Sequence, residues 1–168
     1  MILIFRLYLN VNSVRSGSAA DTQAITDVVK YKLNFAEIEQ GRPASVRDAA
    51  MAFKEICYEY RDSLMAGLIV AGYDKSTGGQ VWCVPIGGMA VRQPMCIGGS
   101  GSTYLYGMMD HMYKENMSKK ECEDLVLQAV TQAIRRDGSS GGCCRMAIIT
   151  KDGVERKLWL NNELPIKY

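Results

Sequence analysis

Two glycine-rich segments hold the side chains of this sequence that are best suited to acid–base chemistry. "RRDGSSGG" (135–142) places Asp137 and Ser140 in one short turn, and "IGGSGSTY" (97–104) contributes Ser100. Carboxylates and hydroxyls accept hydrogen bonds and can help to move a proton. Glycine lets the backbone approach a reacting group closely and adopt positive φ. Both segments are therefore candidate parts of a catalytic or binding site.

Two simple mechanisms fit these segments poorly. Residues 138–142 match the serine-hydrolase pattern G-x-S-x-G, with Ser140 as nucleophile and the only histidine, His111, as base. That pattern needs a strand before the serine and a helix after it, whereas here a helix is predicted first. "GGSGS" could offer amides to a phosphate, but it lacks the lysine of a P-loop and the full dinucleotide spacing. A tight strand-to-helix turn explains it better.

Three predicted helices begin with the same pattern, S-x-x-[DE], at Ser18, Ser45 and Ser118. In this capping box the hydroxyl binds an orphan amide, and the acid three residues later reaches back. Apolar residues at helical spacing then predict the faces that pack in the core. These faces comprise Ala24, Val28 and Leu33 with Ile25 and Val29 beside them; Ala49, Phe53, Ile56, Tyr60 and Leu64; and Cys122, Leu125, Val126, Ala129 and Ala133.

The remaining segments predict strands and one more helix. A strand is expected in "MILIFRLYL", then over 67–74, 80–88 and 89–102, and a helix from about Ser102 to Tyr113. Two further strands, 143–151 and 154–160, flank Asp152-Gly153, which is a strong hairpin signal. The order is strand, two helices, three strands, two helices, two strands. It favours antiparallel sheet covered by helix layers over alternating βαβ units.

Composition narrows the function classes. The chain has 168 residues, 48% of them hydrophobic, which suits a single domain over 1–168. Its net charge is +2 and its basic residues are scattered, so neither a nucleic-acid nor a membrane partner is expected. The apolar N-terminal stretch is too short to span a bilayer. Six cysteines without a C-x-x-C pair, and one histidine, predict no metal or other cofactor and a reducing, intracellular compartment.

A set of motifs in order resembles a catalytic β subunit of the eukaryotic proteasome core particle. The motifs are "RSGSAADTQA" (15–24), "FKEICYEYRDSLMAGLIVAGYD" (53–74), "IGGSGSTYLYG" (97–107), "NMSKKE" (116–121), "RDGSSGG" (136–142) and "GVER" (153–156). They cover most of residues 15–165, whereas residues 1–14 diverge. Together they resemble the caspase-like subunit type, which cuts after acidic residues, and Arg15 distinguishes that type from its immune-inducible counterpart.

The resemblance implies a fold, an activity and partners. The fold would be α/β (α+β), a four-layer α/β/β/α sandwich of the N-terminal nucleophile hydrolase class, truncated at the N-terminus. The chain would join other α and β subunits in stacked heptameric rings, in the cytoplasm and nucleus. There it would act as a threonine-type endopeptidase on unfolded polypeptides in ubiquitin-dependent degradation.

The resemblance also assigns roles to single residues. The catalyst of such subunits is an N-terminal threonine whose own α-amine, with a pKa near ~8, helps to move the proton. Ser100, Asp137 and Ser140 would form the hydrogen-bond shell around it, and the Gly17 backbone N–H would form the oxyanion hole. Arg15 would pair with a substrate carboxylate in the specificity pocket, where Ala19 leaves room.

Residues 1–14, "MILIFRLYLNVNSV", contain no threonine, lysine or aspartate. The nucleophile and its two tuning partners in the family are therefore absent from this sequence, and Thr22 and Thr26 cannot replace them because each falls in a predicted helix. We expect a chain truncated at its N-terminus that keeps the support shell and the pocket but is inactive as written. The alternative from another class is a noncatalytic structural subunit of the same ring.

Overall fold

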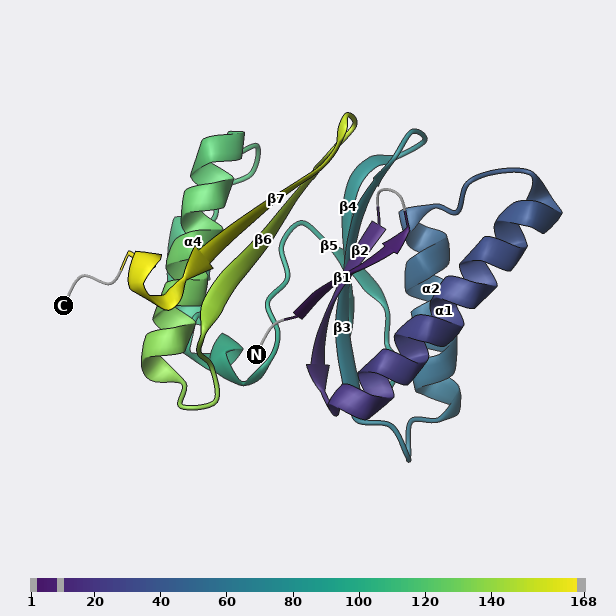
Figure 1. The fold of residues 1–168 in the computed structure, drawn as a ribbon, viewed down its shortest axis with the longest axis horizontal. Helices are drawn as coiled ribbons and strands as arrows, with labels where there is room; N and C mark the ends of the chain where they lie inside the picture. Colours follow the sequence, from purple (N-terminus) through teal and green to yellow (C-terminus); the bar gives the residue numbers. More distant parts are fainter. Residues whose placement is uncertain (1–2, 9–10, 166–168) are drawn as a thin grey trace. The chain divides into compact units, whose positions relative to one another are not determined.

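The computed structural model describes residues 3–8 and 11–165, which fall into two compact units (Figure 1). Among the described residues, the sheet unit comprises 3–8, 11–98 and 147–155, and the helical unit comprises 99–146 and 156–165. The expectation of a single domain over 1–168 stays a prediction.

The sheet unit contains a five-stranded antiparallel sheet in the order β1-β2-β3-β4-β5. The strands are β1 (Leu3–Tyr8), β2 (Val11–Gly17), β3 (Ala66–Asp74), β4 (Gly78–Val84) and β5 (Val91–Gln93). The N-terminal strand prediction therefore covers β1, and its residues Met1, Ile2 and Leu9 lie outside the described residues. Val11 begins a second strand that pairs with β1. β5 is much shorter than the strand expected over 89–102, because Pro94 cannot donate to a ladder.

Two helices, α1 (Ala19–Gln40) and α2 (Val46–Glu59), cover one face of this sheet (Figure 1). α1 packs on β2 and β3, and α2 packs on β3 and β4. The core between the helices and the sheet is built from aliphatic residues around Phe53, which is fully buried.

The face that α1 buries differs from the predicted one. Ile25, Val29 and Leu33 are in the core as expected, but Val28 is 46% exposed and Ala24 is also exposed. The buried stripe instead continues through two threonines. The Thr22 hydroxyl donates to Ala19 O, and the Thr26 hydroxyl donates to Thr22 O. A threonine whose hydroxyl binds a carbonyl of its own helix can enter the core without an unpaired donor.

The other two predicted faces also need correction at their edges. On α2, Ala49 and Phe53 are buried, but Tyr60 is exposed and Cys57 takes its place in the core. On the fourth helix, Cys122 and Val126 are exposed. Large and small apolar residues at the rim of a stripe satisfy the periodicity without being buried, so periodicity alone overestimates the width of a face.

The helical unit contains η1 (Ser100–Tyr104), α3 (Tyr106–Met112), α4 (Lys119–Arg136) and η2 (Asn161–Glu163). η1 and α3 replace the single helix expected from about Ser102 to Tyr113, and both pack on α4. Two further strands, β6 (Cys143–Thr150) and β7 (Gly153–Leu160), form a separate two-stranded sheet, as the Asp152-Gly153 signal predicts. The mixed helix and antiparallel-sheet content confirms the α+β class.

The helix caps follow the sequence pattern in two cases of three. Ser45 and Ser118 each form a full capping box with the acid three residues later. Ser18 accepts from the Asp21 N–H, but the Asp21 carboxylate does not return to Ser18. It accepts instead from the backbone N–H of Met65 at 3.0 Å, and the Ser18 N–H donates to the Met65 carbonyl at 2.8 Å. The start of α1 is thus tied to the segment before β3.

Candidate active site

Asp137 is the centre of a hydrogen-bonded cluster in the helical unit. The Ser100 hydroxyl donates to Asp137 Oδ2 at 2.6 Å, and the Ser140 hydroxyl donates to the same oxygen at 2.6 Å. The backbone N–H of Ser139 donates to the other carboxylate oxygen, Oδ1, at 3.2 Å. These distances are short for hydroxyl donors, as expected when the acceptor is ionised. Asp137 itself is buried, with 8% of its surface exposed.

The sequence places this carboxylate by ending α4 and turning sharply. Asp137 is the C-cap of α4, and its backbone N–H still donates to Ala133. The bond from the Ser139 N–H to the Asp137 side chain is an Asx turn, and the Ser140 N–H closes it on the Asp137 carbonyl at 3.0 Å. The Asp-Gly-Ser-Ser order therefore brings the second serine hydroxyl back onto the carboxylate.

Ser100 reaches the cluster because η1 lies unusually close to α4. Gly99, which precedes η1, has a φ of +90°, a value that favours glycine. A Cβ atom on Gly101 would come within 2.9 Å of the Ala133 Cβ and 3.0 Å of the Ser140 Oγ. Only glycine at 101, opposite a small residue on α4, permits this approach.

The cluster offers acceptors to whatever binds it. Each serine has a single hydroxyl proton, and in both cases that proton is directed at Asp137. The free lone pairs on the two Oγ atoms can then only accept hydrogen bonds. Hydrogen bonds from Ser100 and Ser140, and from the Ser139 backbone, hold the pKa of Asp137 below its usual range. A negatively charged, acceptor-rich site of this kind is suited to a primary amine or ammonium group.

Arg15, Gly17 and Ala19 lie together in the sheet unit, where β2 ends and α1 begins. Arg15 is 7% exposed, and its Nη1 donates to Thr26 Oγ1 on α1 at 3.4 Å. Burial lowers the pKa of Arg15, an effect that the charge of Asp27 partly offsets. Gly17 has a φ of +99°, and a Cβ there would be 2.2 Å from the Met65 carbonyl oxygen. Ala19, the first residue of α1, is exposed.

The predicted site residues are thus grouped by unit. Ser100, Asp137 and Ser140 form one bonded cluster, and Arg15, Gly17 and Ala19 adjoin one another in the other unit. That the Gly17 N–H faces the serine–aspartate cluster stays a prediction.

The serine-hydrolase reading of Ser140 lacks the required geometry. α4 ends before this residue and β6 begins after it, which reverses the strand–serine–helix order of that class. The Ser140 proton is directed at a carboxylate, and His111 is an exposed residue of α3.

Sequence reasoning missed three contributors to these groups. Thr26 is the partner of Arg15, and the i, i+4 pair with Thr22 on the buried face of α1 could have indicated it. Gly101 and Ala133 set the approach of η1 to α4, and a run of glycines is the only sign of the first. The helical spacing placed Ala133 on the packing face of its helix, but it did not indicate that η1 would pack there.

Neither a metal-binding cluster nor a membrane-spanning helix is found among the described residues. Within the described residues, 3–8 and 11–165, His, Cys, Asp and Glu side chains form no group of three or more that could hold a metal ion. Among the helices in those same ranges, each falls short of the length or the apolar character needed to cross a membrane.

Comparison with known proteins connects this geometry to one class. Residues 4–149 match the family model described as "Proteasome subunit". The chain is 51% identical over 151 residues to "Proteasome subunit beta type-6" of Dictyostelium discoideum, covering 90% of this chain and 71% of that protein. It is 48% identical over 158 residues to "Proteasome subunit beta type-1" of Saccharomyces cerevisiae, covering 94% of this chain and 73% of that protein.

A third relative, "Probable proteasome subunit beta type-1" of Schizosaccharomyces pombe, is 49% identical over 150 residues, which are 89% of this chain and 66% of that protein. The chain therefore spans about two thirds to three quarters of the length of these curated relatives. It belongs to the proteasome subunit family, and these relatives are beta-type subunits. The resemblance inferred from the sequence motifs is confirmed at the level of the family.

Proposed function

We propose that this chain is a subunit of a threonine-type endopeptidase within the proteasome core, and that its Asp137 cluster orients the amine of an N-terminal threonine. The observation that carries the proposal is the pair of serine hydroxyls donating to one carboxylate oxygen. This arrangement leaves acceptors and negative charge for an amine, which is the group that such a catalyst must hold.

The proposed substrates are unfolded polypeptides cut after acidic residues. Arg15 is the residue that supports this preference, because a buried guanidinium beside the start of α1 can pair with a carboxylate. Ala19 leaves room next to it, and the Gly17 N–H supplies the oxyanion hole with help from the amino end of α1. The acidic side chain of a bound substrate would then pair with Arg15 on one side of the scissile bond.

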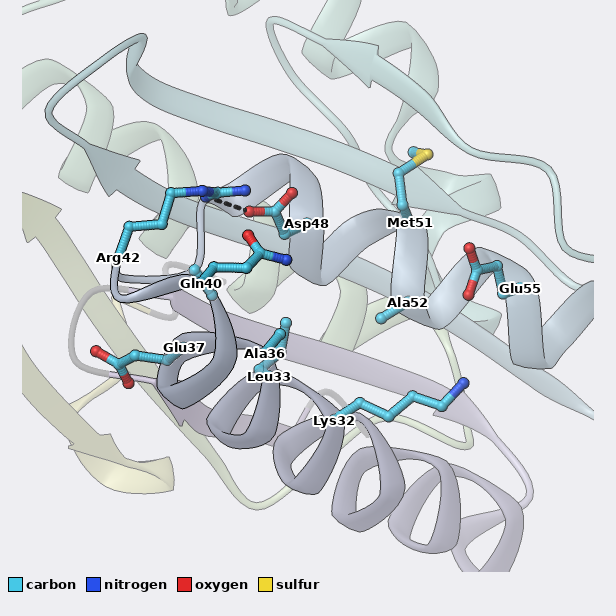
Figure 2. A pocket seen from close by; sticks show the side chains of 11 residues that line it. Lys32, Leu33, Ala36, Glu37, Gln40, Arg42, Asp48, Met51, Ala52 and Glu55 are labelled. Atoms are coloured by element: carbon cyan, nitrogen blue, oxygen red, sulfur yellow. Dashed lines mark hydrogen bonds and ion pairs between the residues drawn. The ribbon is translucent and has the colours of Figure 1, made fainter.

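The proposal includes assembly with other α and β subunits in stacked heptameric rings. It also includes the four-layer α/β/β/α fold and a location in the cytoplasm and nucleus. Exposed apolar residues on α1 support it: Tyr31 is 72%, Phe35 58% and Ile38 82% exposed. Beside them, α1 and α2 enclose a shallow pocket that carries the Arg42–Asp48 ion pair at its rim (Figure 2). A surface of this kind is typical of a protein–protein contact.

Asp137→Asn in assembled particles tests the catalytic role. The substitution keeps the shape of the turn and removes the charge, so kcat/KM for a peptide with Glu before the cut should fall by about 100-fold or more. The carboxylate also stabilises the ammonium form of the amine. Its loss should therefore lower the amine pKa and move the acid limb of the pH–rate profile to lower pH.

A matched variant separates this from a structural effect. Asp110→Asn, an exposed site on α3, should leave both the rate and the profile unchanged. A rate loss in Asp137→Asn with an unmoved acid limb would show that the carboxylate only supports the fold.

The second candidate function is a noncatalytic subunit of the same ring. The observation that favours it is the state of Thr22, whose hydroxyl donates to Ala19 O inside α1 and is not available as a nucleophile. The intact mass and first residue of the subunit in particles purified from cells distinguish the two, since a form that begins with threonine is the catalytic one.

A further inference from the structure

Cys83 belongs to the face of the five-stranded sheet that α1 and α2 leave uncovered. Val84 on β4 and its β3 partner Leu68 are core residues beneath the helices. Successive side chains of a strand point to opposite faces. Cys83 and its own β3 partner, Ile69, therefore lie on the other face of the sheet.

The chain that follows β5 folds back over this second face and brings Cys96 to Cys83. Gly98 lies directly against Ile69, since a Cβ on Gly98 would be 3.6 Å from the Ile69 Cδ1. Two residues earlier, the thiol of Cys96 lies close enough to the thiol of Cys83 for Cys83 to affect the pKa of Cys96. Both cysteines are free and half-buried. Two thiols from separate segments of the sheet unit thus share one site.

The two sulfurs are not equivalent. Burial, together with the neighbouring Cys83 thiol, raises the pKa of Cys96 to about 12. Cys96 consequently keeps its proton at neutral pH, and it also points that proton toward the Ile97 carbonyl oxygen, 3.9 Å from its sulfur. A thiol that keeps its proton is a poor nucleophile, so the attack is assigned to the other sulfur of the pair, that of Cys83.

We propose that Cys83 and Cys96 form a reversible disulfide when the protein meets hydrogen peroxide. The Cys83 thiolate attacks one peroxide oxygen, the O–O bond breaks, and hydroxide leaves and takes a proton from solvent. Cys83 is now a sulfenic acid. The Cys96 sulfur attacks the Cys83 sulfur, the S–O bond breaks, and the departing hydroxide leaves as water with the Cys96 proton. Two thiols and one peroxide yield one disulfide and two waters.

Half-burial suits this reaction. Peroxide is small enough to reach a half-buried pair of thiols, whereas a bulky disulfide reagent has poor access to it. Cellular thiols would return the pair to the reduced form. The bond would fasten the segment after β5 to β4, and Cys96 stands only four residues before Ser100 in the sequence. The link would therefore restrain the chain that leads into the Asp137 cluster.

Peptide mapping tests the proposal directly, because trypsin separates the two cysteines. Cleavage at Lys75, Arg92 and Lys114 leaves Cys83 alone in peptide 76–92 and Cys96 alone in peptide 93–114. The folded chain is treated with peroxide, quenched with catalase, alkylated with iodoacetamide and digested without reductant. The linked pair of these peptides should exceed any other cysteine pair by about tenfold, because the fold holds the thiols at high effective concentration. Dithiothreitol should abolish it.

Two comparisons make the result specific. In guanidinium the preference should disappear, with links spread over all six cysteines. Cys122→Ser, at an exposed position on α4, should leave the link unchanged, whereas Cys96→Ser should leave Cys83 as sulfenic acid that dimedone traps. Links from Cys83 to other cysteines, or alkylation of both Cys83 and Cys96 at a dose that oxidises Cys122, would overturn the proposal.

Discussion

Asp137 carries its charge at the carboxyl end of α4, where the helix dipole favours cations. Arg135 and Arg136 in the last turn follow that preference. An asparagine at the same C-cap could accept the Ser139 N–H and close the same turn. The negative charge is therefore not needed for the turn, and two serine donors are arranged to keep it. A charge maintained against the local field is best explained by a bound cation, here the proposed amine.

The lowered pKa of Asp137 makes part of the chain's stability depend on pH. Its pKa in the folded chain lies below the unfolded value of about 3.9, so the ionised carboxylate contributes stability above that value. This contribution is lost as the pH falls from about 4 through the folded pKa. We expect Asp137→Asn to lose less stability than the wild type over this window, as measured by urea unfolding at a series of pH values.

The matched control for this titration is Asp110→Asn on α3. It should retain the wild-type dependence on pH, because the exposed carboxylate is not part of the cluster. If the free energy of unfolding changed equally with pH in Asp137→Asn and in the wild type, the ionised Asp137 carboxylate would contribute no net stability.

Residue-level reasoning could bring Asp137 and Ser140 together, since only two residues of a glycine-rich turn lie between them. It could not bring in Ser100, which is 37 residues away and joins the cluster only through the packing of η1 on α4. The family resemblance named Ser100, whereas periodicity and spacing did not. Long-range contacts between irregular segments have no repeating signal from which to infer them.

At the scale of the elements, local signals predicted most helices and strands, and tertiary contacts explain the differences. The caps at Ser45 and Ser118 follow the pattern because both partners of each box are local. Asp21 departs from it because the Met65 N–H, 44 residues away, offers the carboxylate a better donor. The face of α1 shifted for a similar reason: Thr22 and Thr26 are polar by type but satisfied within the helix.

The contact between η1 and α4 depends on the missing side chain of Gly101. Gly101→Ala should cost about 1–3 kcal/mol, because its Cβ would overlap the Ala133 Cβ and crowd the Ser140 Oγ. It should also move η1 and weaken the bond from Ser100 to Asp137. Urea unfolding measures the first effect, and the pKa of Asp137 by carboxyl NMR measures the second, with a rise toward its usual value expected.

Gly107→Ala is the matched change six residues away. Nothing lies within 4 Å of an added Cβ there, and the residue is in α3, so alanine should be neutral or stabilise the chain by up to about 1 kcal/mol. If Gly107→Ala were the more damaging of the two, the close approach of η1 to α4 would not be what position 101 provides.

At the scale of the whole molecule, the proposed roles in activation and in substrate selectivity belong to different units. The helical unit holds the acceptor cluster, and the sheet unit holds Arg15 and Gly17. Selectivity and activation should therefore respond to different substitutions. Loss of Asp137 should slow the cleavage of every peptide, because it acts on the nucleophile. Loss of Arg15 should act only where the substrate has a carboxylate to pair with it.

Arg15→Ala in assembled particles, with the neighbouring active sites inactivated, should weaken cleavage after Glu or Asp by roughly ten- to a hundredfold in kcat/KM. That range corresponds to the ~1.5–3 kcal/mol of a buried hydrogen bond to a charged group. Cleavage after apolar residues should fall far less, which makes the paired peptides an internal control for folding and assembly. Arg92→Ala, an exposed change on β5, should alter neither rate. Equal losses on both peptides would assign Arg15 a structural role beneath α1, through Thr26, and remove the basis for an acidic preference.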